Sequence, residues 1–470
     1  MTGKKKILFI CHMSTFFTEQ LGIIKLCLGN NIIPIIQFAC YIDSSMVPCI
    51  EQCLKINIDI YDKKGNKITN LDDVEIIQHT TGQNEPKKVK QTLKRRFVDF
   101  KNNPVNNWSD IKQRFQFRKF VTRKILNEVK PNLVMLGCDI PGHDTAVCIQ
   151  EAHRYGIKTS TVTIAMSNGD DVDFFVTKET HSMKYFLNRI AGLLFPNWVW
   201  NYKGKKVLRL PASYILYYKL HGIEPPKPWL FNSGYIDSII LDGKAYYDYY
   251  ANAGLDKKKL FTLGNLNIDT LYHIVQNKDE LRNQIYEKYH FDKNKKLIVT
   301  AIPPKYLMAG MDEFHDNHYE LLEYWTKTLK NTNCNVIGCP HPSLDIESLK
   351  KYESDNFKIY DGHTVEMVGL ADIFVVNISS SMKWAIACGI PVLNFDIQNM
   401  NYIQYQIGGI VRAINKQEFE NQLKKLTTDD AYYNEIKQKQ IEKSQDWGVL
   451  DGKAGERILN HLNFLMEKNL

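Results

Sequence analysis

Short apolar runs recur along this chain, and stretches with helical periodicity separate them. In the first half these runs are Lys6–Cys11, Ile32–Ala39, Leu133–Leu136 and Thr159–Ile164, and in the second half Lys296–Thr300, Asn335–Gly338, Ile373–Asn377 and Pro391–Phe395. Unbroken apolar runs between helices are typical of parallel strands covered on both faces. The pattern therefore predicts an α/β chain with two doubly wound units.

Composition agrees with folded domains in a reducing compartment. The 470 residues are 44% hydrophobic and 24% charged, and ten cysteines are scattered, several of them inside apolar stretches. Buried, unpaired thiols are typical of cytoplasmic proteins. The first apolar run precedes no small-residue cleavage site, and no run approaches the ~20 residues that span a bilayer. We therefore expect a cytoplasmic protein.

Cysteine spacing gives no sign of a metal centre. Neither Cys49 with Cys53 nor Cys334 with Cys339 has a second pair or a histidine partner at zinc-finger spacing. A structural zinc site needs four such ligands. We therefore expect no bound metal.

The net charge of +8 is unevenly distributed. Residues 85–130 contain fourteen Lys or Arg and four acidic residues. Such an excess attracts an anionic membrane surface or a charged glycan; without a recognition motif, we expect no nucleic-acid partner. The alternative is a solvated helical face whose Phe115, Phe117 and Phe120 pack on the core.

A second segment, Leu187–Lys206, contains Trp198 and several basic residues. It suits either a membrane interface or packing beneath a long loop.

Three serines mark a candidate phosphate site. In Ala371–Asp396 an apolar strand ends at Asn377, Ser379, Ser380 and Ser381 follow, and a helix begins near Met382. Unpaired backbone amides, the helix dipole and hydroxyl groups meet at such a junction, which favours a bound phosphate. A plain helix cap would need only one serine.

This stretch resembles the nucleotide-binding half of GT-B-fold glycosyltransferases and of non-hydrolysing UDP-N-acetylglucosamine 2-epimerases. Similar segments follow the same order over roughly residues 130–400: Leu133–Asp139, Asp144-Thr145-Ala146, Ile236–Asp242, Thr262–Leu271 and Leu297–Thr300. The resemblance implies two Rossmann-like domains facing an interdomain cleft. It places an acceptor domain at 1–275, a nucleotide-sugar donor domain at 276–450, and a C-terminal helix at 451–470 that returns toward the first domain.

A second motif indicates the donor. Cys339-Pro340-His341-Pro342-Ser343 resembles the His-Pro motif of bacterial sialyl- and Kdo transferases, whose histidine and serines contact the CMP phosphate of the donor. A histidine there can donate a proton or neutralise developing charge. The candidate donor contacts are Gly264, Asn265, His341, Pro342, His363, Ser379, Ser380, Ser381 and Lys383. In the epimerases a carboxylate after the phosphate loop holds the ribose, but Met382-Lys383-Trp384 contains no acid.

The catalytic base is less defined. Those transferases carry paired acids before a glycine, a motif that this chain lacks. The candidates are Asp139, Asp144, Asp170 and Asp171, with His341 as the acid. The alternatives are a helix cap for Asp144 and a solvated turn for Asp170 and Asp171.

On the acceptor side the candidates are His12 and His143. His12 follows the first strand, where the alternative is a partly buried polar loop residue.

The preferred hypothesis is a metal-independent, inverting glycosyltransferase of polysaccharide biosynthesis. It would transfer a CMP-activated acidic sugar, of the sialic acid or Kdo type, to a surface glycan or lipid-linked glycan, with no cofactor besides its nucleotide-sugar co-substrate. We expect it in the cytoplasm, with peripheral attachment to the inner face of the plasma membrane. The alternatives are a UDP-sugar 2-epimerase and a non-catalytic scaffold subunit of glycan assembly.

Overall fold

The computed structural model describes residues 4–12, 14–43, 46–74, 76–77, 108–164, 166, 179–202, 204–305, 312–315, 317–341, 344–400, 402 and 405–467. The chain forms two units. The first comprises Met1–Ile240, Tyr250–Phe261 and Ile458–Leu470, and the second comprises Leu241–Tyr249 and Thr262–Arg457. Asp170, Asp171 and Pro342 lie outside the described residues.

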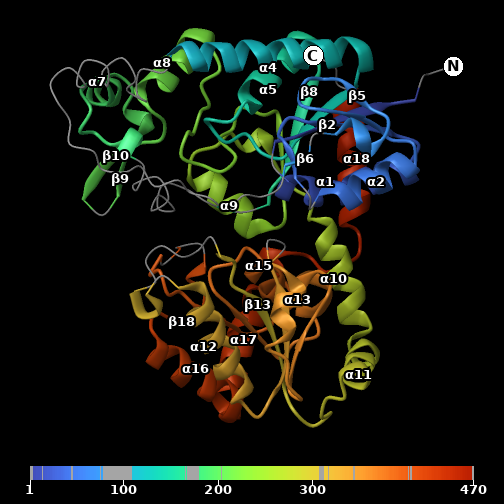
Figure 1. Ribbon diagram of the computed structural model, residues 1–470, viewed down its shortest axis with the longest axis vertical. Helices are drawn as coiled ribbons and strands as arrows, with labels where there is room; N and C mark the ends of the chain where they lie inside the picture. The colour runs from blue at the N-terminus through green and yellow to red at the C-terminus, as the bar shows by residue number, and fades with distance from the viewer. Residues whose placement is uncertain are drawn as a thin grey trace. The chain divides into compact units, whose positions relative to one another are not determined.

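The first unit is built on an eight-stranded sheet with the order β12-β11-β8-β7-β1-β2-β4-β5 (Figure 1). Its strands are β1 Lys6–Cys11, β2 Ile33–Phe38, β4 Asp59–Tyr61, β5 Lys67–Ile68, β7 Leu133–Leu136, β8 Lys158–Val162, β11 Ser238–Leu241 and β12 Leu260–Thr262. Neighbours from β4 to β11 pair in parallel, and β5 pairs antiparallel with β4. Strand order reverses between β1 and β7, which is where doubly wound sheets bind ligands.

Helices and two short strands surround this sheet. They are α1 Ser14–Gly29, α2 Val47–Lys55, α4 Trp108–Val129, α5 Thr145–Arg154, and the paired strands β3 Ile42–Asp43 and β6 Ile76–Ile77. Helix α9 Lys244–Asn252 is divided between the two units after Tyr249. On α4, Phe115 is buried, but Phe117 and Phe120 are 45% and 66% exposed. Only one of the three phenylalanines therefore packs on the core.

Between β8 and β11 the chain inserts a small helical and hairpin segment. It contains α7 Phe186–Leu194, the single turn Pro196–Trp198, β9 Val199–Tyr202, β10 Lys205–Leu208 and α8 Ala212–His221. Trp198 is fully buried, its ring lies edge-on to Tyr218, and its indole N–H donates to Glu224 at 3.0 Å. Trp198 therefore packs inside this segment. Among the described residues, no helix is long and apolar enough to cross a membrane.

The second unit contains a six-stranded, fully parallel sheet with the order β15-β14-β13-β16-β17-β18. The strands are β13 Leu297–Ile302, β14 Asn335–Pro340, β15 Phe357–Ile359, β16 Ile373–Val376, β17 Val392–Phe395 and β18 Ile410–Ala413. Strand order reverses between β13 and β16. Two doubly wound sheets confirm the predicted α/β fold class.

Helices cover both faces of this second sheet. The helices are α10 Leu266–Gln276, α11 Lys278–Tyr289, α12 His318–Lys330, α13 Ile346–Lys350, α14 Thr364–Val368, α15 Met382–Ala387, α16 Lys416–Thr428 and α17 Asp430–Trp447. In β16, Ile373 and Val375 join the cluster formed with α12 and α16. Phe374 and Val376 face the opposite side, because side chains alternate along a strand, and they are fully buried as well. This double burial explains the unbroken apolar runs.

The last helix, α18 Ala454–Glu467, contributes residues to each unit. Within the second unit, the carboxylate of Asp269 accepts the backbone N–H groups of Ala454 and Gly455 at 2.9 and 2.7 Å. This carboxylate caps the start of the helix, where backbone donors are unpaired. Within the first unit, His461 bonds Ser238 at 2.7 Å.

Candidate functional site

The serine turn, Ser379–Ser381, connects β16 to α15 in the second unit. The hydroxyl groups of Ser379 and Ser381 share a hydrogen bond of 2.7 Å, and the Ser381 N–H donates to Ser379 Oγ at 3.2 Å. Ser381 is buried, whereas Ser380 is exposed. The outer two serines therefore shape the turn, and Ser380 presents its hydroxyl group to solvent.

The residue before the serine turn has an unusual backbone. Ile378 has a φ of +39°, which is rare for a β-branched side chain. Its N–H donates to Asn394 Oδ1 at 3.0 Å, and the Asn377 amide donates to Phe395 O and Gln398 Oε1 at 2.7 and 3.0 Å. Bonds from β17 and the loop after it thus hold the turn in a conformation that costs about 1–3 kcal/mol, as often seen at binding sites.

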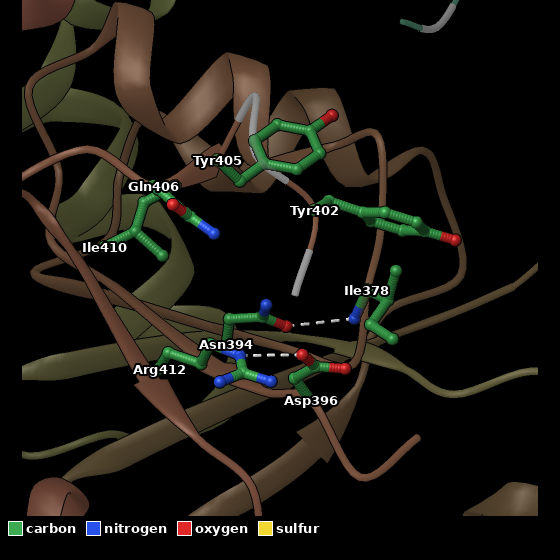
Figure 2. Close-up of a pocket in the computed structure, with 8 residues that line it drawn as sticks. All are labelled: Ile378, Asn394, Asp396, Tyr402, Tyr405, Gln406, Ile410 and Arg412. Atoms are coloured by element: carbon green, nitrogen blue, oxygen red, sulfur yellow. Dashed lines mark hydrogen bonds and ion pairs between the residues drawn. The ribbon is translucent and has the colours of Figure 1, made fainter. Parts of the chain in front are cut away.

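A small pocket opens beside this turn, at the carboxyl ends of β16 and β17 (Figure 2). Its volume is about 60 Å³, and it is lined by Ile378, Asn394, Asp396, Tyr402, Tyr405, Gln406, Ile410 and Arg412. Arg412 Nε lies 2.7 Å from Asp396 Oδ2. Such a volume holds a few water molecules or one small group, because whole-ligand pockets occupy about 300–1,000 Å³.

Sequence reasoning did not select these lining residues. One signal was available, because Asp396 directly follows the apolar run of β17 at the same sheet edge as the serines. The loop residues and Arg412 carry no pattern of their own.

His341 follows β14 at the same edge of the sheet. Both β14 and β16 pair with β13, so their ends lie about 10 Å apart, two strand spacings. Burial lowers the pKa of His341 below its usual value. The ring is therefore mainly neutral near pH 7, and the residue sits across β13 from the serine turn.

His363 and Lys383 have well-defined local roles. His363 is exposed at the start of α14, where its N–H donates to Glu366 Oε2 at 3.3 Å. Lys383 is buried in α15, and its ammonium group lies 2.9 Å from Asp242 Oδ2. The positive charge of Lys383 is thus balanced inside the protein, which favours a structural role over donor contact.

Gly264 and Asn265 begin the segment that leads into α10. Gly264 has a φ of +91°, and a Cβ there would lie 2.8 Å from the Ala454 side chain. Asn265 is buried and caps α10, because its Oδ1 accepts the Asn267 N–H at 2.9 Å. These contacts explain both residues through packing and capping.

In the first unit, Asp139 follows β7 and ties down a loop. Its carboxylate accepts the backbone N–H groups of Ser233, Tyr235 and Ile236, the last two at 2.8 and 3.1 Å. Burial raises its pKa, although these hydrogen bonds oppose the shift. Its oxygens are already occupied, so the contacts favour a structural role over that of the base.

His12, His143 and Asp144 lie near one another at the point where the first sheet reverses its strand order. Asp144 pairs with Arg114 Nε at 2.9 Å and Arg118 Nε at 3.4 Å. Burial lowers the pKa of His12 well below its usual value, and the nearby charges of Arg118 and His143 lower it further. Burial likewise lowers the pKa of His143. The structure therefore groups both acceptor-side histidines with one candidate base.

Within the described ranges, no three or more His, Cys, Asp or Glu side chains are grouped so as to hold a metal ion.

No protein-family model and no curated protein matches the chain. Solved structures do match over nearly the whole length. The structure of CalG4, the calicheamicin glycosyltransferase, covers 100% of this chain and 99% of its own, with a TM-score of 0.56 and 10% identity. The UDP complex of MnaA from S. aureus covers 98% and 97% of the two chains, with a TM-score of 0.52 and 14% identity. The chain has the GT-B fold.

A further match supports the same fold. The UDP-GlcNAc 2-epimerase from Neisseria meningitidis, bound to UDP-GlcNAc, covers 98% of this chain and 100% of its own, with a TM-score of 0.51 and 12% identity. The predicted GT-B resemblance is confirmed for the fold. In this GT-B chain, polar candidates gather at the carboxyl ends of both sheets, where open α/β sheets bind ligands.

Proposed function

We propose that this chain is a glycosyltransferase that binds a nucleotide-activated sugar in its second unit. The observation that carries the proposal is the placement of His341 and the serine turn on either side of β13, at the carboxyl edge of the sheet. Ligands bind at this reversal of strand order in doubly wound sheets. A span of about 10 Å, two strand spacings, suits a nucleotide phosphate with its attached groups.

The roles of the residues follow from their chemistry. Ser380 would donate its hydroxyl group to a phosphate oxygen, while Ser379 and Ser381 keep the turn in shape. His341 would stabilise the departing nucleotide phosphate, and Pro342 would restrict the backbone after it. We propose a CMP-activated acidic sugar as the donor because of the His-Pro and triple-serine motifs; the similar MnaA and Neisseria structures contain UDP and UDP-GlcNAc instead.

We place the acceptor, a glycan or lipid-linked glycan of polysaccharide biosynthesis, with the first domain, residues 1–275. The donor then belongs to residues 276–450, with 451–470 as the closing helix.

Asp144, Asp170 and Asp171 are the proposed bases. Each of the three can be replaced by asparagine. The variant that lacks the base should lose turnover but still bind the nucleotide, because a base acts on the acceptor hydroxyl group.

A second candidate function is UDP-sugar 2-epimerisation. The similarity to the MnaA and Neisseria structures supports it. Against it stands the sequence after the serine turn, which supplies Lys383 and Trp384 where a ribose-binding carboxylate is expected. A non-catalytic scaffold of glycan assembly is the remaining alternative.

Nucleotide binding is the first test. A nucleotide that binds the folded protein raises its melting temperature. We expect CMP to raise it more than UDP, GDP or CDP, and Ser380→Ala to reduce the shift. Ser444→Ala, a partly buried serine in α17, is the matched control. Equal melting temperatures with and without every nucleotide would contradict the proposal and favour the scaffold.

Reaction chemistry separates the two enzymes. A 2-epimerase must break the C2–H bond, so UDP-sugar incubated alone in D₂O would gain deuterium at C2. A glycosyltransferase releases its nucleotide when an acceptor takes the sugar. Deuterium at C2 without an acceptor would replace the transferase proposal by the epimerase.

A further inference from the structure

Helix α7 turns its large apolar side chains outward. Asn188, Ala191 and Gly192 form its buried side. The opposite side, here called the apolar face, consists of Phe186, Leu187, Ile190, Leu193 and Leu194, which are 67%, 38%, 38%, 83% and 66% exposed. At about 100° per residue these five side chains cover an arc of roughly 120°. Exposed apolar patches of this kind mark interaction sites.

Packing on the buried side fixes this orientation. The Asn188 amide donates to Thr180 O and Ser182 O, both at 2.9 Å, and its Oδ1 accepts the Ala212 N–H at 3.0 Å. A Cβ on Gly192 would lie 2.6 Å from Met183 Cε. Rotating the helix to bury its leucines would break these three hydrogen bonds and force large side chains into this contact. Packing on the buried side of α7 therefore fixes the outward orientation of the apolar face.

The surroundings of the apolar face are cationic. Residues 180–223 contain seven Lys or Arg and no Asp or Glu. Those that are described and exposed are Lys184, Arg189, Lys205, Lys206 and Lys219, of which Lys219 pairs with Glu224, the acid directly after this stretch. The Arg189 guanidinium lies 6.0 Å from the centre of the Phe186 ring. Figure 1 shows α7, which carries Arg189, grouped with α8 and with the β9–β10 hairpin, which carries Lys205 and Lys206.

From this combination we infer that the apolar face docks on an anionic phospholipid surface. Helices that lie in a membrane interface bury Phe and Leu among the acyl chains while Lys and Arg contact the head groups. A second copy of the chain fits less well, because pairing two identical faces would bring like charges together. The docking helix is α7, whereas the buried Trp198 cannot contact lipid.

Vesicle co-sedimentation with the full chain tests this inference. We expect binding to phosphatidylcholine vesicles containing 30% phosphatidylglycerol, on the order of tenfold weaker binding to pure phosphatidylcholine, and loss of binding with added salt. Leu193→Gln with Leu194→Gln should weaken binding to the anionic vesicles by about tenfold or more. Lys205→Glu with Lys206→Glu should weaken it and reduce its salt dependence.

Matched controls keep the result specific. Leu28→Gln with Ile56→Gln changes two exposed apolar residues elsewhere in the same unit, and Lys257→Glu with Lys258→Glu changes two exposed lysines there. Both pairs should bind as the parent does. No binding to the anionic vesicles at low salt, or parental binding by the leucine variant, would overturn the inference. A dimer that the leucine variant dissociates would overturn it as well, in favour of a second copy. None of these outcomes depends on the proposed transferase activity.

Discussion

The ammonium group of Lys383 lies 2.9 Å from a carboxylate oxygen of Asp242, and the side chains are only 2% and 1% exposed. The Tyr246 ring centre lies 5.8 Å from the same ammonium group. Lys383 is the second residue of α15, two residues after the serine turn, and Asp242 directly follows β11. This buried pair therefore anchors the helix that carries the proposed phosphate site.

Removing one member of the pair should destabilise the protein strongly. Asp242→Asn leaves an uncompensated buried ammonium group, which costs about 3–5 kcal/mol. Urea denaturation should show a matching decrease in the free energy of unfolding. The double variant Asp242→Leu with Lys383→Met removes both charges and should recover much of the lost free energy of unfolding. A loss below about 1 kcal/mol in Asp242→Asn would contradict the pairing.

Ser380 and Ser381 should respond differently to replacement by alanine. Ser380→Ala should weaken nucleotide binding by about 1.5–3 kcal/mol, the range for hydrogen bonds to charged groups, with an unchanged melting temperature. Ser381→Ala should also lower the melting temperature, because it removes the bond to Ser379. Calorimetric titration and thermal denaturation measure the two effects. Unchanged nucleotide affinity in both variants would remove the serine turn from the site.

His341→Ala should lower turnover far more than it raises the donor KM. Stabilisation of the departing phosphate grows as the glycosidic bond breaks, so its loss acts mainly on kcat, by roughly 10²–10⁴-fold if the histidine acts as an acid. A donor with a better leaving group should partly restore the rate.

His363→Ala is the control for His341→Ala. His363 is exposed, so its replacement should change KM more than kcat if it contacts the nucleotide. Normal turnover in His341→Ala would remove both the His-Pro assignment and the argument for a CMP-linked donor.

The fold was predictable because its strands are buried on both faces. The run Lys6–Cys11 coincides with β1, and Ile373–Asn377 extends β16 by one residue. Short outer strands such as Phe357–Ile359 were missed, because three residues with a central lysine give no unbroken apolar run. Unbroken apolar runs therefore locate the central strands of a sheet better than its edge strands.

The site was only partly predictable, because side-chain partners come from distant segments. The serines and His341 follow apolar strands, a pattern visible along the chain. The Asp242 partner of Lys383, and the three backbone amides around Asp139, come from segments far away in sequence. No local pattern reports such partners, so both residues looked like free functional groups.

Acid should destabilise the first unit through His461 in α18. Its ring bonds Ser238 Oγ at 2.7 Å and lies 4.1 Å from the Phe261 ring. Burial lowers the pKa of His461 to about 4. Between pH 6.5 and about 4 the unfolded chain binds a proton at this residue and the folded chain does not, so stability rises with pH across that window. The difference is about 3 kcal/mol at about 1.36 kcal/mol per pKa unit.

Comparison with His461→Gln isolates this contribution. Glutamine cannot titrate but can still bond Ser238, so the variant should lose less stability than the parent between pH 6.5 and 4.5, and the two should differ little in slope above pH 7. Burial also lowers the pKa of His143 and His318, but both histidines remain in the variant and cancel in the comparison. Urea midpoints at four pH values measure the effect. Parallel pH profiles for parent and variant would mean that His461 becomes protonated in the folded state without cost, which its burial among Phe261 and Ser238 argues against.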